Sequence, residues 1–251
     1  MEKMSQDNAL YNRTELLLGS ASMKRLAATK VILFGVGGVG SWCAECLIRS
    51  GVGHLTIVDS DCVNPSNLNR QLQATTHTLG QLKVDALKER LLSINTEADI
   101  TARPELYSAE TADSFHLETF DYVIDAIDSL TPKAHLILHA TNLPVTLFSS
   151  MGAALKLDPA KIRVAEFWKI TYCPLARSLR KKFKHWEKFP NQKFQCVYSP
   201  EVLENQGDGS EDTMPEAFNK VQVNGSLAHI TAIFGFMLAG LLIQNVMTAD
   251  R

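Results

Sequence analysis

The chemically most informative stretch of the sequence is a glycine-rich turn between an apolar run and a helical pattern. Gly35, Gly37 and Gly40 fit the spacing G-x-G-x-x-G, and Gly38 adds a further glycine. In this spacing the first glycine permits a sharp turn, the second lets backbone approach a phosphate, and the third lets a helix pack on the preceding strand. Unpaired N–H groups at the start of that helix then face the anion. The turn therefore predicts a nucleotide-binding site.

An acidic residue stands where the ribose of a bound nucleotide would lie. Asp59 follows the apolar run of residues 54–58, and a carboxylate at that place can accept hydrogen bonds from ribose hydroxyls. Up to this point, a dehydrogenase that binds NAD and an enzyme that binds ATP would look the same. The choice depends on the residues that follow, beginning with the stretch from Asp61 to Gln71.

Charged residues beyond the turn favour ATP over NAD. An adenylating enzyme releases pyrophosphate, on which negative charge grows in the transition state. Arg70 and Lys83 can supply a guanidinium fork and a point charge for it. Asn67 can hydrogen-bond a phosphate oxygen, and Asp128 can bind a Mg²⁺ ion on the triphosphate through its oxygens. Together these four residues indicate ATP and Mg²⁺ as the cofactors.

Such a site needs a scaffold whose strands end at one edge. Strand patterns alternate with helical patterns along the first part of the chain, which predicts an α/β fold with a doubly wound, mainly parallel, Rossmann-like sheet. The predicted strands are residues 31–34, 54–58, 99–102, 122–127 and 144–149, and the predicted helices are residues 39–49, 79–93 and 132–141.

The pattern changes after Gly152. Residues 162–167 alternate and predict an antiparallel strand that extends the sheet, whereas residues 201–216 are acidic, contain glycine and proline, and predict a mobile loop. Residues 226–247 form an apolar C-terminal helix pattern, and a membrane helix needs ~20 apolar residues. We favour a helix buried against the sheet, because His229 and Gln244 interrupt the apolar run, and keep membrane contact as the alternative.

The overall composition is that of a soluble protein. The chain has 251 residues, 45% of them hydrophobic and 21% charged, which is enough for one large α/β core. The net charge of −2 creates no global field that attracts nucleic acid, so such binding needs a local basic patch. Five cysteines without paired spacing suit a reducing compartment, and the first residues lack the apolar core of a signal peptide. We therefore expect a cytoplasmic protein.

Several motifs resemble the adenylating domain of ubiquitin-activating-type, ThiF-like enzymes. They are GVGGVG, Asp59–Asp61, SNLNRQ, GQLKVD and DAIDS, and the resemblance covers residues 11–150 as the nucleotide-binding core. It implies ATP, Mg²⁺, and attack of a carboxylate on the α-phosphate to give an acyl-adenylate. The implied nucleotide contacts are the four glycines, Asp59 (ribose), Asp61, Asn67, Arg70, Gln71, Lys83 and Asp128, the last also holding the metal.

The sequence YNR near the N-terminus also matches this superfamily. There the corresponding arginine reaches the ATP site of the opposite subunit. The resemblance therefore makes Arg13 a candidate trans-acting residue, beside Arg70, Lys83 and Asp128 as the implied catalytic set, and it implies a homodimer.

The second part of the chain resembles one branch of the superfamily. Sulfur-carrier activators usually have two C-x-x-C pairs for a structural zinc, but this chain has only Cys43–Cys46, so we do not expect zinc. The stretches SSMGAALKLDPAKIRVAEF, CPLARSLRKKFK, QCVYSPE and TAIFGFMLAG instead resemble tRNA threonylcarbamoyladenosine dehydratases. This implies one ThiF-type adenylating domain over residues 1–251, with residues 151–251 as a family-specific extension.

The resemblance to that family implies a specific reaction. The carboxylate of a threonylcarbamoyl group on a tRNA adenosine beside the anticodon is adenylated, the group's own nitrogen attacks, AMP leaves and a ring closes. Because the nucleophile belongs to the substrate, no catalytic cysteine is needed, and effective molarities can reach ~10⁵ M. Cys196 could line the pocket or be a small buried residue, and we assign no role to Cys173.

A basic segment follows Cys173. Basic residues with aromatic residues between them suit a phosphate backbone and unstacked anticodon bases. On a helix within residues 177–188, the implied tRNA contacts are Arg177, Arg180, Lys181, Lys182 and Lys184. A solvated helix is the alternative, and the substrate implied by the family favours the tRNA contact.

Two other classes of function stay open at this point. One is an adenylyltransferase that activates a ubiquitin-like sulfur-carrier protein, against which the missing zinc pairs and the basic segment count. The other is an NAD-dependent oxidoreductase or a nucleotide-binding scaffold, against which Arg70, Lys83 and Asp128 count. The family is also associated with sulfur-relay protein partners, although no residue here identifies one.

Overall fold

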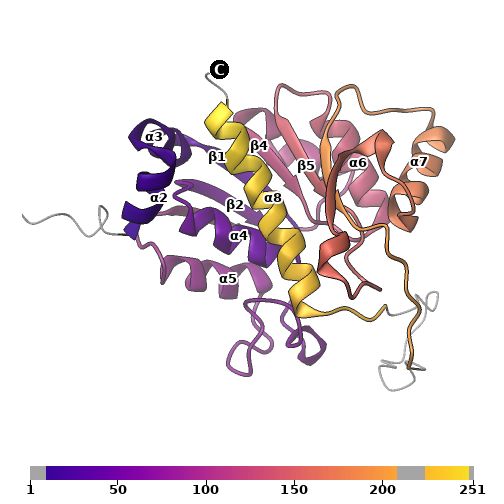
Figure 1. Ribbon diagram of the computed structural model, residues 1–251, viewed down its shortest axis with the longest axis horizontal. Coiled ribbons are helices and arrows are strands. Elements are labelled where there is room, and N and C mark those ends of the chain that lie inside the picture. Colours follow the sequence, from indigo (N-terminus) through magenta and orange to yellow (C-terminus); the bar gives the residue numbers. More distant parts are fainter. Residues whose placement is uncertain (1–9, 208–223, 249–251) are drawn as a thin grey trace, which may run out of the picture.

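Seven strands form one sheet in the computed structural model, which describes residues 10–207 and 224–248 (Figure 1). Their order across the sheet is β3-β2-β1-β4-β5-β7-β6. The strands are β1 (Lys30–Phe34), β2 (His54–Val58), β3 (Asp99–Arg103), β4 (Tyr122–Asp125), β5 (Thr146–Ser150), β6 (Arg163–Glu166) and β7 (Gln195–Tyr198).

All neighbouring strands are parallel except the last pair. Strand β1 pairs with β2 on one side and with β4 on the other, and β7 continues the parallel sheet beside β5. Strand β6 is antiparallel to β7, with Ala165 opposite Cys196. This arrangement confirms the predicted doubly wound, mainly parallel sheet with an antiparallel extension. The order reverses between β1 and β4, and ligands of such sheets bind beside that reversal, at the carboxyl ends of the strands.

Helices cover both faces of the sheet. Successive residues of β1 pack into the hydrophobic cores on opposite faces of the sheet: Leu33 packs on one face and Phe34 on the other. The first face is covered by α3 (Ser20–Ala28), α4 (Gly40–Arg49), α5 (Lys83–Leu92) and α8 (Ala228–Thr248), and the second by α6 (Leu130–Ala140) and α7 (Pro174–Trp186) (Figure 1). The remaining helical segments are α2 (Asn12–Leu18) and the 3₁₀ turns η1 (Pro65–Asn67), η2 (Ala112–Phe115), η3 (Leu117–Thr119), η4 (Pro159–Lys161) and η5 (Phe167–Lys169).

Most predicted elements are present, with some different limits. Helix α5 begins at Lys83 and not at residue 79, because residues 80–83 are bonded to the segment after β2: Val63 N donates to Gln81 O and Lys83 N to Asp61 O. The N-terminal helices and β7 were not predicted. Of the predicted loop 201–216, residues 201–207 contain no helix or strand, and the rest lies outside the described residues.

The apolar C-terminal helix lies across the first face of the sheet, beside α4 (Figure 1). It is long and apolar enough to cross a membrane by length and composition, with a mean hydropathy of 1.9, but half of that stretch is buried inside the protein. Gly235 makes the contact with α4 close, since a Cβ there would lie 2.4 Å from Val39 O. The helix thus packs against the sheet as predicted.

Candidate active site

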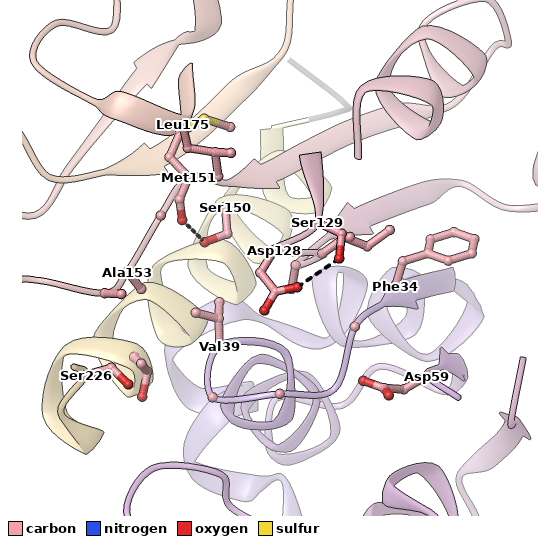
Figure 2. Close-up of a pocket in the computed structure, with 18 of the residues that line it drawn as sticks. Phe34, Val39, Asp59, Asp128, Ser129, Ser150, Met151, Ala153, Leu175 and Ser226 are labelled. Carbon is pink, nitrogen blue, oxygen red and sulfur yellow. Dashed lines mark hydrogen bonds between the residues drawn. The ribbon is translucent and has the colours of Figure 1, made fainter. Parts of the chain in front are cut away.

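A cavity of about 850 Å³ opens at the carboxyl ends of the central strands. Its walls include the residues that directly follow β1, β2, β4 and β5, which is where the reversal of strand order predicts a ligand. Figure 2 shows Phe34 and Asp59 on one side of this cavity and Ala153, Leu175 and Ser226 on the other, with Asp128 and Val39 between them. We call the two sides the nucleotide half and the substrate half.

The glycine turn lines the cavity between its two halves. Gly35 has a φ of +86°, and a Cβ there would lie 2.7 Å from Ala126 O. At Gly40 a Cβ would lie 1.8 Å from Gly35 O, so α4 can start this close to β1 only with glycine. At Gly37 the nearest atom to a Cβ would be Gln71 Nε2 at 3.8 Å, so the protein itself leaves that position open. The first and third glycines therefore shape the turn, and the second leaves room for a phosphate.

The carboxylate of Asp59 is fixed beside the turn. Its Oδ2 accepts from Val36 N at 2.8 Å and its Oδ1 from Asp61 N at 3.0 Å. Burial raises the pKa of Asp59 above its ordinary value, although the Asp61 N–H, the nearby charge of Lys83 and the Val36 N–H oppose this shift. Each carboxylate oxygen keeps a second lone pair, which suits hydrogen bonds from ribose hydroxyls.

Two of the predicted cations line the nucleotide half. Lys83 starts α5, is buried, and its Nζ lies 2.7 Å from Asp61 Oδ2. Arg70 donates from Nη1 to Ser66 O and to Asn69 Oδ1, while a guanidinium has three further donors on Nε and Nη2. Both positive charges thus border the cavity, on segments held together by backbone hydrogen bonds.

The site also contains a buried acceptor that is not bonded by the described part of the chain. Gln71 lines the cavity with 6% of its surface exposed, and its Oε1 has no hydrogen-bond partner among the described residues. Native proteins seldom leave such an atom unpaired. The open space at Gly37 and this amide, which lie next to each other, fit a polar ligand over the turn.

Asp128 is exposed and faces the cavity (Figure 2). Its Oδ1 accepts one long hydrogen bond, 3.4 Å, from Ser129 Oγ, so most of its lone pairs are free for a ligand. No group of three or more His, Cys, Asp or Glu side chains that could hold a metal occurs within residues 10–207 and 224–248. A single carboxylate is enough to hold Mg²⁺ only when phosphates and water supply most of the other ligands, as is usual for Mg²⁺ bound to a nucleotide.

Of the residues predicted for the nucleotide site, Gly40, Asn67 and Arg13 lie outside the cavity lining. Asn67 is buried, and its Oδ1 accepts from Asn64 N at 3.1 Å in a capping box of η1, so it stabilises this turn and does not reach the cavity. Arg13 lies on α2 with an exposed side chain, away from the cavity of its own chain.

A buried ion pair beneath the site was not predicted. Lys133 and Asp125 are both fully buried, with 2.7 Å between Nζ and Oδ2. Ser149 Oγ donates to the same carboxylate oxygen at 2.6 Å. Lys133 Nζ also donates to Ile127 O at 2.9 Å, and Ile127 N donates to Asp125 Oδ1 at 3.1 Å. This network holds the turn between β4 and Asp128.

The substrate half is made by the last residue of β5 and the segment 151–156 after it, the first turn of α7, and residues near Ser226. Most of these residues are small or apolar. Cys173, which received no role from the sequence, lines this half, whereas Cys196 is fully buried in β7 and does not. Burial also raises the pKa of the Cys196 thiol far above its ordinary value. Lys156 lines the substrate half as well and was not predicted.

The basic segment forms α7, and only part of it faces solvent. Arg177, Lys181 and Lys184 are exposed. Lys182 lies 4.8 Å from the ring centre of Trp186. Arg180 points inward: its Nη2 donates to Phe167 O and to Ile170 O, each at 2.7 Å. These two bonds within the protein count against a tRNA contact by Arg180, which stays a prediction.

Comparisons with known proteins agree with this geometry. The ThiF family model matches residues 11–251. The tRNA threonylcarbamoyladenosine dehydratase of Bacillus subtilis (strain 168) is 42% identical over 174 residues, covering 69% of this chain and 68% of that protein. The enzyme of the same name from Escherichia coli (strain K12) is 32% identical over 249 residues, covering 94% of this chain and 93% of that protein.

Solved structures give the same relationship. Crystal structures of E. coli tRNA N6-threonylcarbamoyladenosine dehydratase with AMP and with ATP superpose with TM-scores of 0.88 and 0.87. Each is 30% identical to this chain and covers 100% of it, with 98% of the crystal structure's chain matched. The match extends through the second part of the chain, which carried the more specific resemblance. The chain belongs to the ThiF family, among the tRNA threonylcarbamoyladenosine dehydratases.

Proposed function

We propose that this chain catalyses the ATP-dependent dehydration of threonylcarbamoyladenosine in tRNA. The observation that carries the proposal is the cavity itself. Its nucleotide half contains the glycine turn, Asp59, Arg70, Lys83 and Asp128, and it opens directly into a second half lined mainly by small and apolar residues. A reaction that joins a carboxylate to a nucleotide phosphate needs both substrates in one such space.

In this mechanism the nucleotide half holds ATP. The N–H groups at the start of α4, Arg70 and Lys83 bind the phosphates, and Asp59 binds the ribose. Asp128 would hold Mg²⁺, which would neutralise phosphate charge when bound. The carboxylate attacks the α-phosphate and pyrophosphate leaves. Removing Arg70 or Lys83 should slow this half-reaction by ~10²–10³, because charge grows there in the transition state.

The second half-reaction needs no group of the protein as nucleophile. The nitrogen of the threonylcarbamoyl group attacks the acyl carbon, the bond to AMP breaks, and the nitrogen loses its proton as the ring closes. Cys196 is excluded from this step by its position in the core and by its raised pKa. Cys196→Ser should therefore keep turnover, whereas a thioester trapped on this residue would contradict direct cyclisation.

Release of pyrophosphate separates the candidate substrates. We expect ATP-dependent release with tRNA that carries threonylcarbamoyladenosine, and none with the same tRNA lacking the group. Release with a ubiquitin-like sulfur-carrier protein, and not with tRNA, would favour the adenylyltransferase alternative. Tight NADH binding without ATP affinity would favour an oxidoreductase and contradict the proposal.

We also propose that the active form is a homodimer in which Arg13 completes the site of the partner subunit. This is supported by the position of Arg13, which is exposed and does not line its own cavity. Helix α2 also exposes Leu16 and Leu17 by 81% and 82%, as a helix with an apolar contact surface would.

Three further expectations complete the proposal. We treat residues 1–251 as one adenylating domain, with the extension 151–251 supplying the substrate half. We place the reaction in the cytoplasm, in keeping with the free cysteines of the described residues. A sulfur-relay protein partner stays an expectation from the family resemblance, and no described residue is assigned to it.

A further inference from the structure

The substrate half of the cavity carries one charged side chain. Among the lining residues of that half that the structure describes, Lys156 is the only acid or base apart from the thiol of Cys173. The other cations of the cavity, Arg70 and Lys83, belong to the nucleotide half and are bonded there. A buried positive charge therefore stands on the side of the cavity opposite to the ribose-binding position.

Lys156 is held in place by its surroundings. Only 6% of the residue is exposed, and Nζ donates to the carbonyl oxygen of Glu201. Both backbone groups of the preceding residue are hydrogen-bonded: Leu155 N donates to Gly225 O at 2.9 Å, and Leu203 N donates to Leu155 O at 3.1 Å. Leu155 also has a positive φ of 58°, a backbone conformation that such residues rarely adopt. The amine thus has a defined position and is not a long side chain lying along the surface.

The charge of Lys156 lacks a carboxylate partner within the described residues. The nearest candidate is Glu201, but its Oε2 accepts from Leu157 N at 2.6 Å and from Asp158 N at 3.0 Å. Its Oε1 lies 2.9 Å from Lys161 Nζ. An ammonium group has three donors, so the bond to the Glu201 carbonyl leaves two for a ligand. Burial accordingly lowers the pKa of Lys156 below its ordinary value, and Cys173 and Glu201 oppose the shift.

We propose that Lys156 binds the carboxylate of the threonylcarbamoyl group and thereby selects tRNA that carries this group. The inference rests on the proposed function. One carboxylate oxygen would accept a charge-assisted hydrogen bond from Nζ, which leaves the other oxygen free to attack the α-phosphate. After adenylation the same donor would contact the acyl oxygen. Lys156 forms no covalent bond in either step.

The test compares two tRNAs that differ only in the reacting group. One carries threonylcarbamoyladenosine and the other an unmodified adenosine at the same position. The wild type should bind the first more tightly. Lys156→Met should raise the Kd for the modified tRNA by about 10- to 100-fold, the usual effect of losing a hydrogen bond to a charged group. Its Kd for unmodified tRNA and for ATP should stay within about twofold.

Lys161 provides a matched control, because it interacts with the same residue, Glu201. It is half exposed and does not line the cavity, so Lys161→Met should keep the preference for modified tRNA. In pyrophosphate release, Lys156→Met should raise the KM for tRNA and leave the KM for ATP unchanged. If Lys156→Met does not fold, as judged by its melting curve, Lys156→Gln is measured in the same way.

Distinct results contradict the inference and the proposed function. If the Lys156 variant loses affinity equally for both tRNAs, or behaves like the Lys161 variant, Lys156 is a structural residue and the inference is wrong. If the wild type itself neither prefers the modified tRNA nor releases pyrophosphate with it, the proposed function fails. If the wild type releases pyrophosphate with the modified tRNA but Lys156→Met keeps the preference for modified over unmodified tRNA, only the inference is overturned.

Discussion

The buried pair Asp125–Lys133 provides the sharpest test of how the site is held. Both side chains are fully buried, and their charges are 2.7 Å apart. In Lys133→Met the carboxylate of Asp125 would keep its hydrogen bonds from Ser149 Oγ and Ile127 N but lose its counter-charge. Methionine is a suitable replacement because it is unbranched and fills irregular apolar space.

The expected loss follows from the type of interaction. Removing one partner of a buried ion pair costs about 3–5 kcal/mol, because the remaining charge stays buried without compensation. For a protein of this size, 1 kcal/mol shifts the melting temperature by about 2–4 °C. The melting temperature of Lys133→Met should therefore fall by about 6–20 °C. The charge-free double variant Asp125→Asn with Lys133→Met should be more stable than the single variant.

Urea unfolding with a thermal melt measures this loss. Lys24→Met on the exposed side of α3 serves as the control and should change the free energy of unfolding by less than about 0.5 kcal/mol. If Lys133→Met loses less than about 1 kcal/mol and the double variant is no better, the pair does not stabilise the fold as an ion pair. The reasoning from burial would then be refuted at this position.

Other changes test the assignments of single residues. When the Arg13→Ala and Asp128→Ala variants are mixed and allowed to exchange subunits, the mixed dimers should regain activity. No recovery would contradict the proposal that Arg13 acts in the site of the partner subunit. Arg180→Met should lower the free energy of unfolding by about 1–3 kcal/mol, because two carbonyls lose their donor, whereas Lys181→Gln should instead weaken tRNA binding and flatten its salt dependence. Backbone N–H groups and Lys161 lower the pKa of Glu201 to about 2, so its ionised form stabilises the fold at neutral pH. Urea unfolding should show that Glu201→Gln is less stable than the wild type near pH 6, with the difference vanishing as the pH falls from its ordinary pKa toward 2; a constant difference would contradict this.

The nucleotide half could be predicted because its residues are local to strand ends. Parallel strands deliver their carboxyl ends to one edge, so a turn after β1 and an acid after β2 must meet whatever the rest of the chain does. The glycine spacing added a steric reason, which the close approach of Gly40 to Gly35 O bears out. The positions of Asp59 and Asp128 at this edge could likewise be predicted from the strand order alone.

The substrate half could not be predicted in the same way. It is assembled from the segment after β5, the first turn of α7 and residues near Ser226, whose meeting depends on long-range packing. Lys156 stands in a stretch of ordinary loop composition, and nothing local marks it as buried. The inward orientation of Arg180 differs in this respect, since the apolar positions Leu179 and Phe183 already indicate which side of the helix faces the core. Asn67 shows that a polar residue inside a motif can serve the motif's own turn.

The unpredicted ion pair links stability to the chemistry of the site. Lys133 Nζ donates to Ile127 O while Asp125 accepts from Ile127 N, so one buried pair bonds both backbone polar groups of the residue that precedes Asp128. Past the end of a strand the backbone no longer pairs with the neighbouring strands. The backbone N–H and C=O groups freed there need other partners when they are buried. Here Lys133 of the following helix and the carboxylate of Asp125 supply them, and Ser149 of the next strand donates to that carboxylate. The position of the turn that presents Asp128 to the cavity therefore depends on the buried pair, and a change at Lys133 should weaken stability and nucleotide chemistry together.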